Sequence, residues 1–120
     1  MKVLIVDDSK AMRMIVARTL RQAGFGDAVM IEASNGREAL SIIQDSPPDL
    51  VLCDWNMPEM NGMELLQELR NSESRIPFGF VTSEASQDMK DSAVQSGALF
   101  LITKPFTPQV FEQTIGGVLS

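Results

Sequence analysis

Five short apolar runs, spaced at fairly regular intervals, constrain the fold of this chain most. They lie at residues 2–6, 28–33, 50–53, 78–82 and 98–103, and their apolar residues are nearly continuous rather than alternating. Runs of that kind are typical of strands that are buried on both faces, as in a parallel sheet. Parallel strands need long crossover connections, which are usually helices. The pattern therefore predicts five parallel strands joined by helices.

The segments between these runs show helical spacing. The first has side chains at a helical period, at Met12, Ile15, Val16, Thr19, Leu20 and Ala23. Gly24 is expected just past the end of that helix, where a left-handed residue often closes the last turn. The next two helices are expected at 36–45 and 62–71, each preceded by an asparagine that fits an N-cap.

The last two predicted helices differ in character. A helix at 84–96 is expected to be only weakly apolar, with Met89, Ala93 and Val94 as its main core contributors. The final helix is expected to begin at Pro108 after a threonine cap, since proline is favoured at the first helical position.

Strands and helices thus alternate five times within 120 residues. Right-handed crossovers then give a doubly wound α/β fold, a (βα)5 arrangement with helices on both faces of a five-stranded parallel sheet. The chain has no room for a second domain, so residues 1–120 are expected to form one. Ligands of such sheets bind at the carboxyl ends of the strands, near the switch point in strand order. Functional residues are therefore expected at the strand ends.

Five polar residues stand at the ends of the predicted strands: Asp7, Asp8, Asp54, Thr82 and Lys104. Two carboxylates about 5 Å apart repel each other by roughly 3 kcal/mol at an effective dielectric constant near 20. Three of them together are expected to raise the pKa of at least one, or to bind a cation. Because the candidate ligands are hard oxygens, Mg²⁺ is favoured over zinc or copper. With Mg²⁺ and the lysine ammonium, the formal charge of the site is zero.

These residue types suit phosphoryl transfer. A carboxylate attacks phosphorus to form an acyl phosphate, and Asp54 is the expected nucleophile. Mg²⁺ would neutralise phosphoryl oxygens, while Lys104 and the Thr82 hydroxyl would hold the others. Each residue alone has an ordinary structural role, as a helix cap, a strand end or a solvated lysine. Their combination at one rim favours the functional interpretation.

Four motifs follow one another along the chain: VDDSKAMR, DWNMPEMNG, VTSEA and KPF. On these motifs the chain resembles the response-regulator receiver domain of two-component signalling, most closely the stand-alone chemotaxis type. The resemblance covers the whole length and implies a flavodoxin-like sheet with strand order 2-1-3-4-5 and no output domain. It also implies that a partner kinase's phosphohistidine phosphorylates Asp54 and so switches on signalling through protein binding.

The resemblance further implies a set of ligands. Asp8, Asp54 and the backbone carbonyl of Asn56 would bind Mg²⁺, and Asp7 would join through a water molecule. Asn56 and Glu84 occupy the positions that tune how fast the acyl phosphate hydrolyses, and these residue types resemble the quickly hydrolysing chemotaxis type. The protein would catalyse its own phosphorylation and dephosphorylation without turning over an external substrate.

The predicted switch departs from the family at one position. Receiver domains usually carry Tyr or Phe three residues before the lysine of strand 5, where this chain has Leu101. The chain has no tyrosine, and Phe100 has the wrong strand parity for that role. The resemblance implies that Thr82 follows the phosphoryl group, with Leu101 in place of the aromatic residue. It also implies a cis peptide bond between Lys104 and Pro105.

Composition excludes several classes of function. The chain contains no histidine, which excludes a histidine general base, a Ser-His triad, His-ligated zinc and a phosphohistidine carrier. The single cysteine, Cys53, excludes an internal disulfide and is interpreted as a core residue. A net charge of −6 argues against a direct nucleic-acid binder. No apolar stretch reaches the roughly 18–20 residues of a membrane span, and the N-terminus does not fit a signal peptide, so a cytoplasmic location is expected.

Two protein partners are expected. One is the phosphodonor, a sensor histidine kinase or a phosphotransfer protein. The other is a downstream target, expected at the face formed by the fourth helix, the fifth strand and the fifth helix. The protein is expected to be a monomer, at least before phosphorylation.

Three other functions stay open at this point. A phosphohydrolase of the haloacid-dehalogenase type uses the same residue types, but its nucleophile normally ends strand 1 in a D-x-D pattern. An FMN-binding, flavodoxin-like electron carrier would need a first loop rich in Ser, Thr and Gly, whereas acids at positions 7 and 8 repel a phosphate. The third is a receiver-like binding module that is never phosphorylated. This alternative stays open because Leu101 replaces the aromatic residue that receiver domains usually carry at that position.

Overall fold

Five parallel strands form the sheet, in the order β2-β1-β3-β4-β5. The computed structural model describes residues 1–119, and Ser120, the last residue of the predicted domain, lies outside the described residues. The strands are β1 (Lys2–Val6), β2 (Val29–Ala33), β3 (Leu50–Cys53), β4 (Phe78–Thr82) and β5 (Phe100–Thr103). Every neighbouring pair is parallel, so the predicted fold class and strand order are confirmed.

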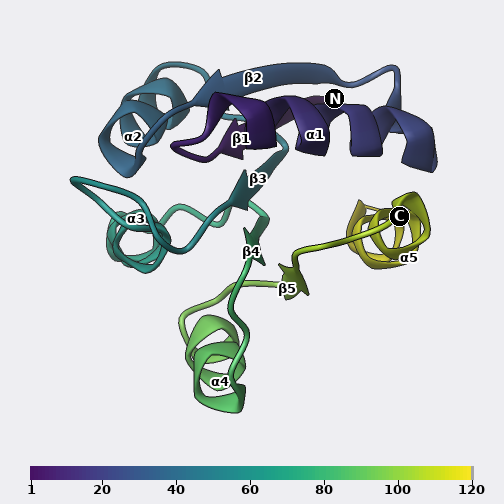
Figure 1. The fold of residues 1–120 in the computed structure, drawn as a ribbon. Helices are drawn as coiled ribbons and strands as arrows, with labels where there is room; N and C mark the ends of the chain where they lie inside the picture. The colour runs from purple at the N-terminus through teal and green to yellow at the C-terminus, as the bar shows by residue number, and fades with distance from the viewer. Residues whose placement is uncertain (120) are drawn as a thin grey trace.

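Helices connect the strands and cover both faces of the sheet (Figure 1). They are α1 (Lys10–Leu20), the π-helical turn η1 (Arg21–Phe25), α2 (Gly36–Asp45), α3 (Gly62–Asn71), α4 (Gln87–Gln95) and α5 (Pro108–Leu119). Figure 1 shows α2, α3 and α4 to the left of the strands and α5 to the right. Among the described residues, no helix is both long and apolar enough to span a membrane.

The sheet separates two apolar cores, and β1 contributes to both. Leu4 and Val6 pack in the core beneath α2, α3 and α4, whereas Val3 and Ile5 pack in the core beneath α1 and α5. All four side chains are at most 1% exposed. This burial on both faces explains why the strand residues are continuously apolar.

Side chains cap the helices largely where the sequence predicted caps. Asn35 accepts from the Glu38 N–H at 2.8 Å at the start of α2. Asn61 and Glu64 exchange two hydrogen bonds at the start of α3, which forms a capping box. Thr107 caps α5 by accepting from the N–H of a residue in its first turn, at 3.3 Å.

Two elements start two or more residues later than predicted. The fourth helix begins at Gln87 rather than 84, because Ser86 caps it and leaves 83–86 as a loop. The fifth strand begins at Phe100 rather than 98, because the Ala98 N–H bonds to a carbonyl of α4 instead of joining the sheet. Both shifts come from hydrogen bonds, one to the Ser86 hydroxyl and one to the Ala93 carbonyl, that apolar spacing does not indicate.

Two predicted core residues are on the surface. Ile15 of α1 is 37% exposed and Val94 of α4 is 67% exposed. Helical periodicity identifies the apolar face of each helix, but it does not show how much of that face the rest of the fold covers. Gly24 does adopt the expected left-handed conformation (φ +103°), within η1 rather than directly after a regular helix.

Candidate functional site

Three carboxylates meet where β1 and β3 end. Asp7 and Asp8 follow β1, and Asp54 follows β3, its neighbour in the sheet. One carboxylate oxygen from each of the three lies within 4.8 Å of the others. Asp7 is 4% exposed and Asp54 9%, whereas Asp8 is open to solvent. The structure thus brings together the three acids that the sequence places at strand ends.

The Lys104 ammonium reaches this cluster from the end of β5. Its Nζ lies 3.1 Å from Asp7 Oδ2 and 3.6 Å from Asp54 Oδ2. The Lys104 N–H donates to the Thr82 carbonyl at 2.8 Å, and the peptide bond that follows, to Pro105, is cis. The amine therefore offsets part of the negative charge of two of the acids.

The surroundings of the Asp54 carboxyl raise its pKa. Burial is the largest cause, because water solvates the charged form less well there. The Lys104 ammonium opposes burial and lowers the pKa, and the Asp7 charge raises it again. The Trp55 N–H donates to Asp54 Oδ1 at 2.8 Å and lowers the pKa further. The expectation that one clustered acid has a raised pKa is confirmed in direction, with burial as the main cause.

The Thr82 hydroxyl faces the same carboxylate without a regular partner. Thr82 is 0% exposed, and its Oγ1 completes no hydrogen bond of regular geometry with any residue in 1–119. The hydroxyl still lowers the pKa of the Asp54 carboxyl, and it is the weakest of the causes that shift this pKa. A buried hydroxyl without a full partner costs free energy. A group bound to Asp54 would supply the missing acceptor.

The loop after Asp54 is packed closely against β4 and α3. The Trp55 ring lies on the fully buried Phe80 ring, with centroids 4.7 Å apart and an interplanar angle of 34°. The Gly62 N–H donates to the Trp55 carbonyl at 2.9 Å. A side chain at Gly62 would collide with the Asp54 carbonyl and the Phe80 ring, so this approach requires glycine. The acceptor candidate therefore projects from a tightly held loop.

The remaining predicted residues lie around the rim or in the cores. Asn56 and Glu84 are exposed to solvent, and their tuning roles stay predictions. Leu101 is half-buried against the core beneath α2, α3 and α4, whereas Phe100 packs against the opposite core. The predicted difference in parity between Phe100 and Leu101 is therefore confirmed.

Arg13 was not expected at this site. Its Nη1 donates to the Asp7 carbonyl at 2.7 Å, and its Nε donates to Glu32 Oε1 at 2.8 Å. The available signal was its place in the VDDSKAMR motif, one helical turn after the Ser9 cap.

The acid cluster fits a magnesium ion. Two oxygens on opposite sides of Mg²⁺ lie about 4.2 Å apart, because each Mg–O bond is about 2.1 Å. The carboxylate oxygens of Asp7, Asp8 and Asp54 already lie within 4.8 Å of one another. They are hard ligands, and the open side chain of Asp8 leaves room for water, which Mg²⁺ retains when bound.

Comparison with known proteins identifies the class to which this fold and site belong. Residues 3–116 match the response regulator receiver domain, and the chain belongs to this family. It is thus a phosphorylation-activated signalling switch of two-component systems. Receiver domains generally bind Mg²⁺ at an acidic pocket, and Asp7, Asp8 and Asp54 form an acidic cluster that could hold a metal ion.

Within the family, the chain is similar to chemotaxis proteins. It is 40% identical to chemotaxis protein CheY1 of Helicobacter pylori over 123 residues, which cover 99% of this chain and 97% of that protein. It is also 40% identical to chemotaxis protein CheY of Pseudomonas aeruginosa, with 96% and 93% covered. The structure of chemotaxis response regulator CheY4 of Vibrio cholerae superposes with a TM-score of 0.84 at 35% identity, covering 98% and 97%. These findings give no support to the phosphohydrolase, flavodoxin or unphosphorylated-module alternatives.

Proposed function

We propose that Asp54 is the phosphoacceptor of this switch, in a reaction that needs Mg²⁺. The observation that carries the proposal is the position of the Asp54 carboxylate, which lies 3.6 Å from the Lys104 ammonium and within 4.8 Å of two further acids. An Asp54 oxygen forms the new O–P bond while the N–P bond of the donor phosphohistidine breaks. The departing imidazole keeps the bonding electron pair.

Asp8, Asp54 and the backbone carbonyl of Asn56 would hold Mg²⁺, and Asp7 would join through a water molecule. The ion would supply positive charge to the phosphoryl oxygens. Lys104 would move its ammonium from the acids toward a phosphoryl oxygen, since it is already within reach of Asp54. Thr82 would donate its buried hydroxyl to another phosphoryl oxygen.

The same site would also remove the phosphoryl group. Water attacks phosphorus, the O–P bond to Asp54 breaks, and the carboxylate and inorganic phosphate are released. Asn56 and Glu84, at the exposed rim, would tune access of that water. This self-hydrolysis resets the switch without turnover of an external substrate.

We propose separate faces for the two protein partners. The downstream target would bind an exposed apolar surface around β5, made by Val94, Leu99 and Val110, which are 67%, 53% and 38% exposed. Val94 belongs to α4, Leu99 directly precedes β5, and Val110 belongs to α5. Figure 1 shows α4 and α5 on either side of β5. Large apolar side chains are thus left exposed on all three of these segments, and exposed apolar side chains that form one patch are typical of a protein-binding surface.

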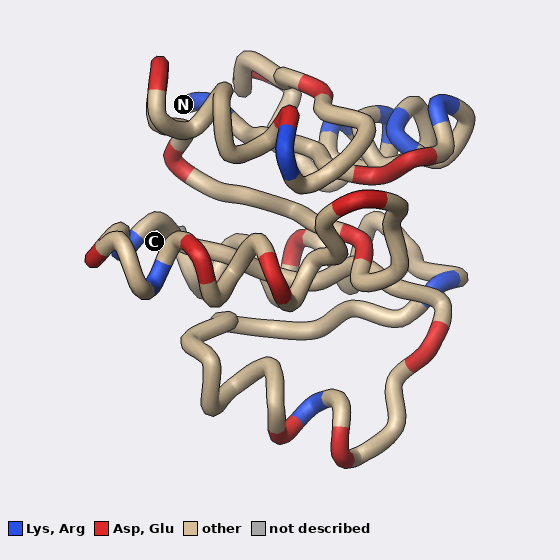
Figure 2. The backbone as a smooth tube through the Cα atoms, turned by 90° about the vertical axis from the view of Figure 1, so that its left-hand side faces the viewer, with Lys and Arg blue, Asp and Glu red and all other residues tan. Residues whose placement is uncertain are grey.

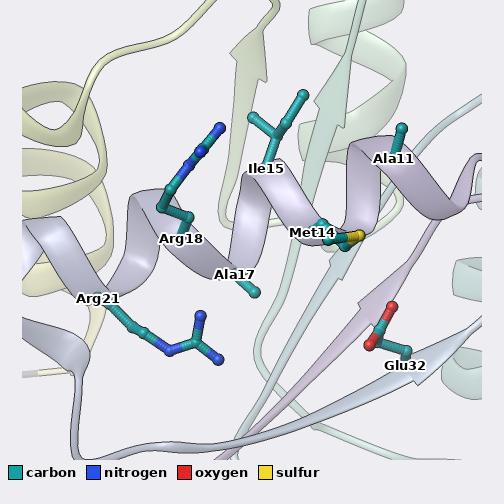
Figure 3. Close-up of a pocket in the computed structure, with 7 residues that line it drawn as sticks. All are labelled: Ala11, Met14, Ile15, Ala17, Arg18, Arg21 and Glu32. Atoms are coloured by element: carbon teal, nitrogen blue, oxygen red, sulfur yellow. The ribbon is translucent and has the colours of Figure 1, made fainter.

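The phosphodonor would dock along α1, in a groove lined by residues 11–21 and by Glu32 of β2. Figure 3 shows the residues that line it, which are Ala11, Met14, Ile15, Ala17, Arg18, Arg21 and Glu32. Met14 is 61% exposed, and Ile15 also borders a second hollow formed with Met12, Lys104, Pro105 and Phe106. Figure 2 shows Lys and Arg positions gathered at the upper right, where α1 lies. A partner with an apolar surface flanked by acids would fit this face.

The acceptor is tested by intact mass after incubation with a small phosphodonor such as acetyl phosphate. Wild type is expected to gain one phosphoryl group only with Mg²⁺, and Asp54→Asn to gain none. Asp27→Asn, which changes an exposed acid outside the site, is the matched control and should react like wild type. If hydrolysis is too fast for detection, beryllofluoride should still change Trp55 fluorescence in wild type. No adduct and no beryllofluoride response would overturn the proposal.

The two faces are tested with one substitution on each, by measuring the rate of phosphorylation and the binding of the downstream target. Ile15→Glu is expected to slow phosphorylation by a phosphohistidine protein but not by acetyl phosphate. Val94→Glu is expected to leave both phosphorylation rates unchanged and to abolish binding of the downstream target. The reverse pattern would exchange the two assignments.

A further inference from the structure

We propose that Arg13 is a positioning residue for the metal site, and that Glu32 holds Arg13 in place. The inference rests on the proposed Mg²⁺-dependent function and adds two residues to it. Arg13 fixes the short segment from which Asp7 and Asp8 project, so that both carboxylates face one ion.

The hydrogen bond from Arg13 acts on the peptide group between the two acids. Arg13 Nη1 donates to the Asp7 carbonyl at 2.7 Å, and this carbonyl belongs to the peptide bond that joins Asp7 to Asp8. A peptide group is planar, so fixing its oxygen also fixes the direction in which the chain continues to Asp8. On the other side, the Asp7 N–H donates to the Ala33 carbonyl of β2 at 3.1 Å. Both backbone groups of Asp7 are therefore held.

Glu32 completes the arrangement from the neighbouring strand. Arg13 Nε donates to Glu32 Oε1 at 2.8 Å, and the Arg13 side chain is only 14% exposed. A guanidinium is a rigid planar fork, so its two donors can meet two acceptors at fixed angles. Lysine at position 13 has no such fork and could not reproduce both contacts. The guanidinium thus ties the acid turn at the end of β1 to the carboxyl end of β2.

Charge alone would make Arg13 unfavourable for metal binding. A guanidinium beside the acid cluster repels a cation, and Glu32 offsets that charge. Removing Arg13 should therefore tighten Mg²⁺ binding if charge is the whole effect, and weaken it if positioning dominates. The sign of the change separates the two explanations.

The test compares Arg13→Met with Arg18→Met by Mg²⁺ titration of Trp55 fluorescence. Both variants lose one positive charge from α1, but Arg18 is exposed and outside the acid cluster. Arg13→Met is expected to weaken Mg²⁺ binding about tenfold, as is usual when a partner that orients a ligand is lost. Arg18→Met should bind as wild type or slightly tighter. Unchanged or tighter binding in Arg13→Met would overturn the inference.

Two further variants and one metal-independent readout complete the design. Arg13→Lys keeps the positive charge but loses the planar fork, so it should still bind Mg²⁺ weakly, and it decides the question if Arg13→Met does not fold. Glu32→Gln should also weaken Mg²⁺ binding several-fold. Without Mg²⁺, the Ser9 amide, which donates to Asp7 Oδ1 at 2.9 Å, should exchange hydrogen faster in Arg13→Met. If wild type neither binds Mg²⁺ nor accepts phosphate, the proposed function fails. If wild type does both and Arg13→Met matches it at every Mg²⁺ concentration, only this inference fails.

Discussion

The Lys104 ammonium lies 3.1 Å from a carboxylate oxygen of Asp7, although the two residues stand 97 positions apart in the chain. β1 and β5 are separated in the sheet by β3 and β4, so the lysine side chain reaches across the strand ends. Both side chains are largely shielded from water, 16% and 5% exposed. The pair therefore joins the first and last strands at the functional rim.

Lys104→Met is expected to destabilise the protein at pH 7, because it leaves Asp7 and Asp54 charged without their common partner. The loss should be about 2 kcal/mol, less than for a fully buried pair. Mg²⁺ should restore part of it, since the ion replaces the missing positive charge. Urea unfolding with and without Mg²⁺ measures both effects. Lys90→Met, at an exposed lysine of α4, should change neither stability nor the response to Mg²⁺.

Asp54→Asn is expected to stabilise the protein in the absence of Mg²⁺. The folded state raises the Asp54 pKa above its ordinary value of 3.8, chiefly through burial, so it binds this proton more tightly than the unfolded chain. The contribution of Asp54 to stability is therefore most favourable below pH 3.8 and falls as the pH rises through the raised folded pKa. At pH 7 the variant should be more stable by about 1 kcal/mol, the usual scale for relieving a functional strain.

The pH dependence of that difference provides the check. Asn resembles a protonated carboxyl, so wild type and Asp54→Asn should converge in stability as the pH falls toward 4. Urea midpoints of the two proteins across pH 4–8 measure this directly. A difference that stays constant over the range would show that the carboxylate charge is not the cause.

Asp8→Asn is expected to remove the response to Mg²⁺ with little change in the fold, because Asp8 is exposed. At about ten times its dissociation constant, Mg²⁺ should add about 1.4 kcal/mol to wild-type stability. For a domain of this size that raises the melting temperature by about 5 °C. Thermal unfolding with and without Mg²⁺ should show this rise in wild type and in Asp27→Asn, but not in Asp8→Asn. An equal rise in all three proteins would place the ion elsewhere.

The convergence of Asp7, Asp54 and Lys104 could be predicted because strand ends of a parallel sheet share one edge, whatever the side-chain details. The contact from Arg13 to the Asp7 carbonyl could not, since it depends on the direction of α1 relative to the end of β1. The exposure of Ile15 was missed for a related reason. Periodicity finds the face of a helix, but the reach of neighbouring elements decides how much of that face is covered.

Thr82→Val is expected to stabilise the resting protein by about 1 kcal/mol, because it replaces a buried hydroxyl without a regular partner by a methyl group. Thr19→Val is the matched control. Its hydroxyl is also buried, but it donates to the Ile15 carbonyl at 2.8 Å, so the same substitution should be destabilising. Urea unfolding compares the two. Beryllofluoride should reduce or reverse the stability advantage of Thr82→Val over wild type. The variant lacks the hydroxyl that would donate to the bound group, so it should gain less stability from binding than wild type does.

Gly79→Ala is expected to destabilise the protein by about 2 kcal/mol, because a methyl group there would collide with the Phe100 ring. The ring of Phe100 on β5 lies over Gly79, its partner in the β4–β5 register. Phe100→Leu should recover stability in the Gly79→Ala background and lose it in the wild-type background. A double-mutant cycle by urea unfolding measures this coupling.

Gly116→Ala provides the opposite control for Gly79→Ala. Gly116 lies within α5, and among residues 1–119 no atom beyond its chain neighbours and its own helix backbone lies within 4 Å of an added methyl group, so alanine should stabilise by about 0.5–1 kcal/mol through helix propensity alone. Neither glycine is part of the acid cluster, so both variants should accept a phosphoryl group from acetyl phosphate at the wild-type rate at a temperature where they are folded. Stability lost equally at both positions would point to a general cost of alanine. Stability lost at neither would show that the Phe100 ring moves aside freely.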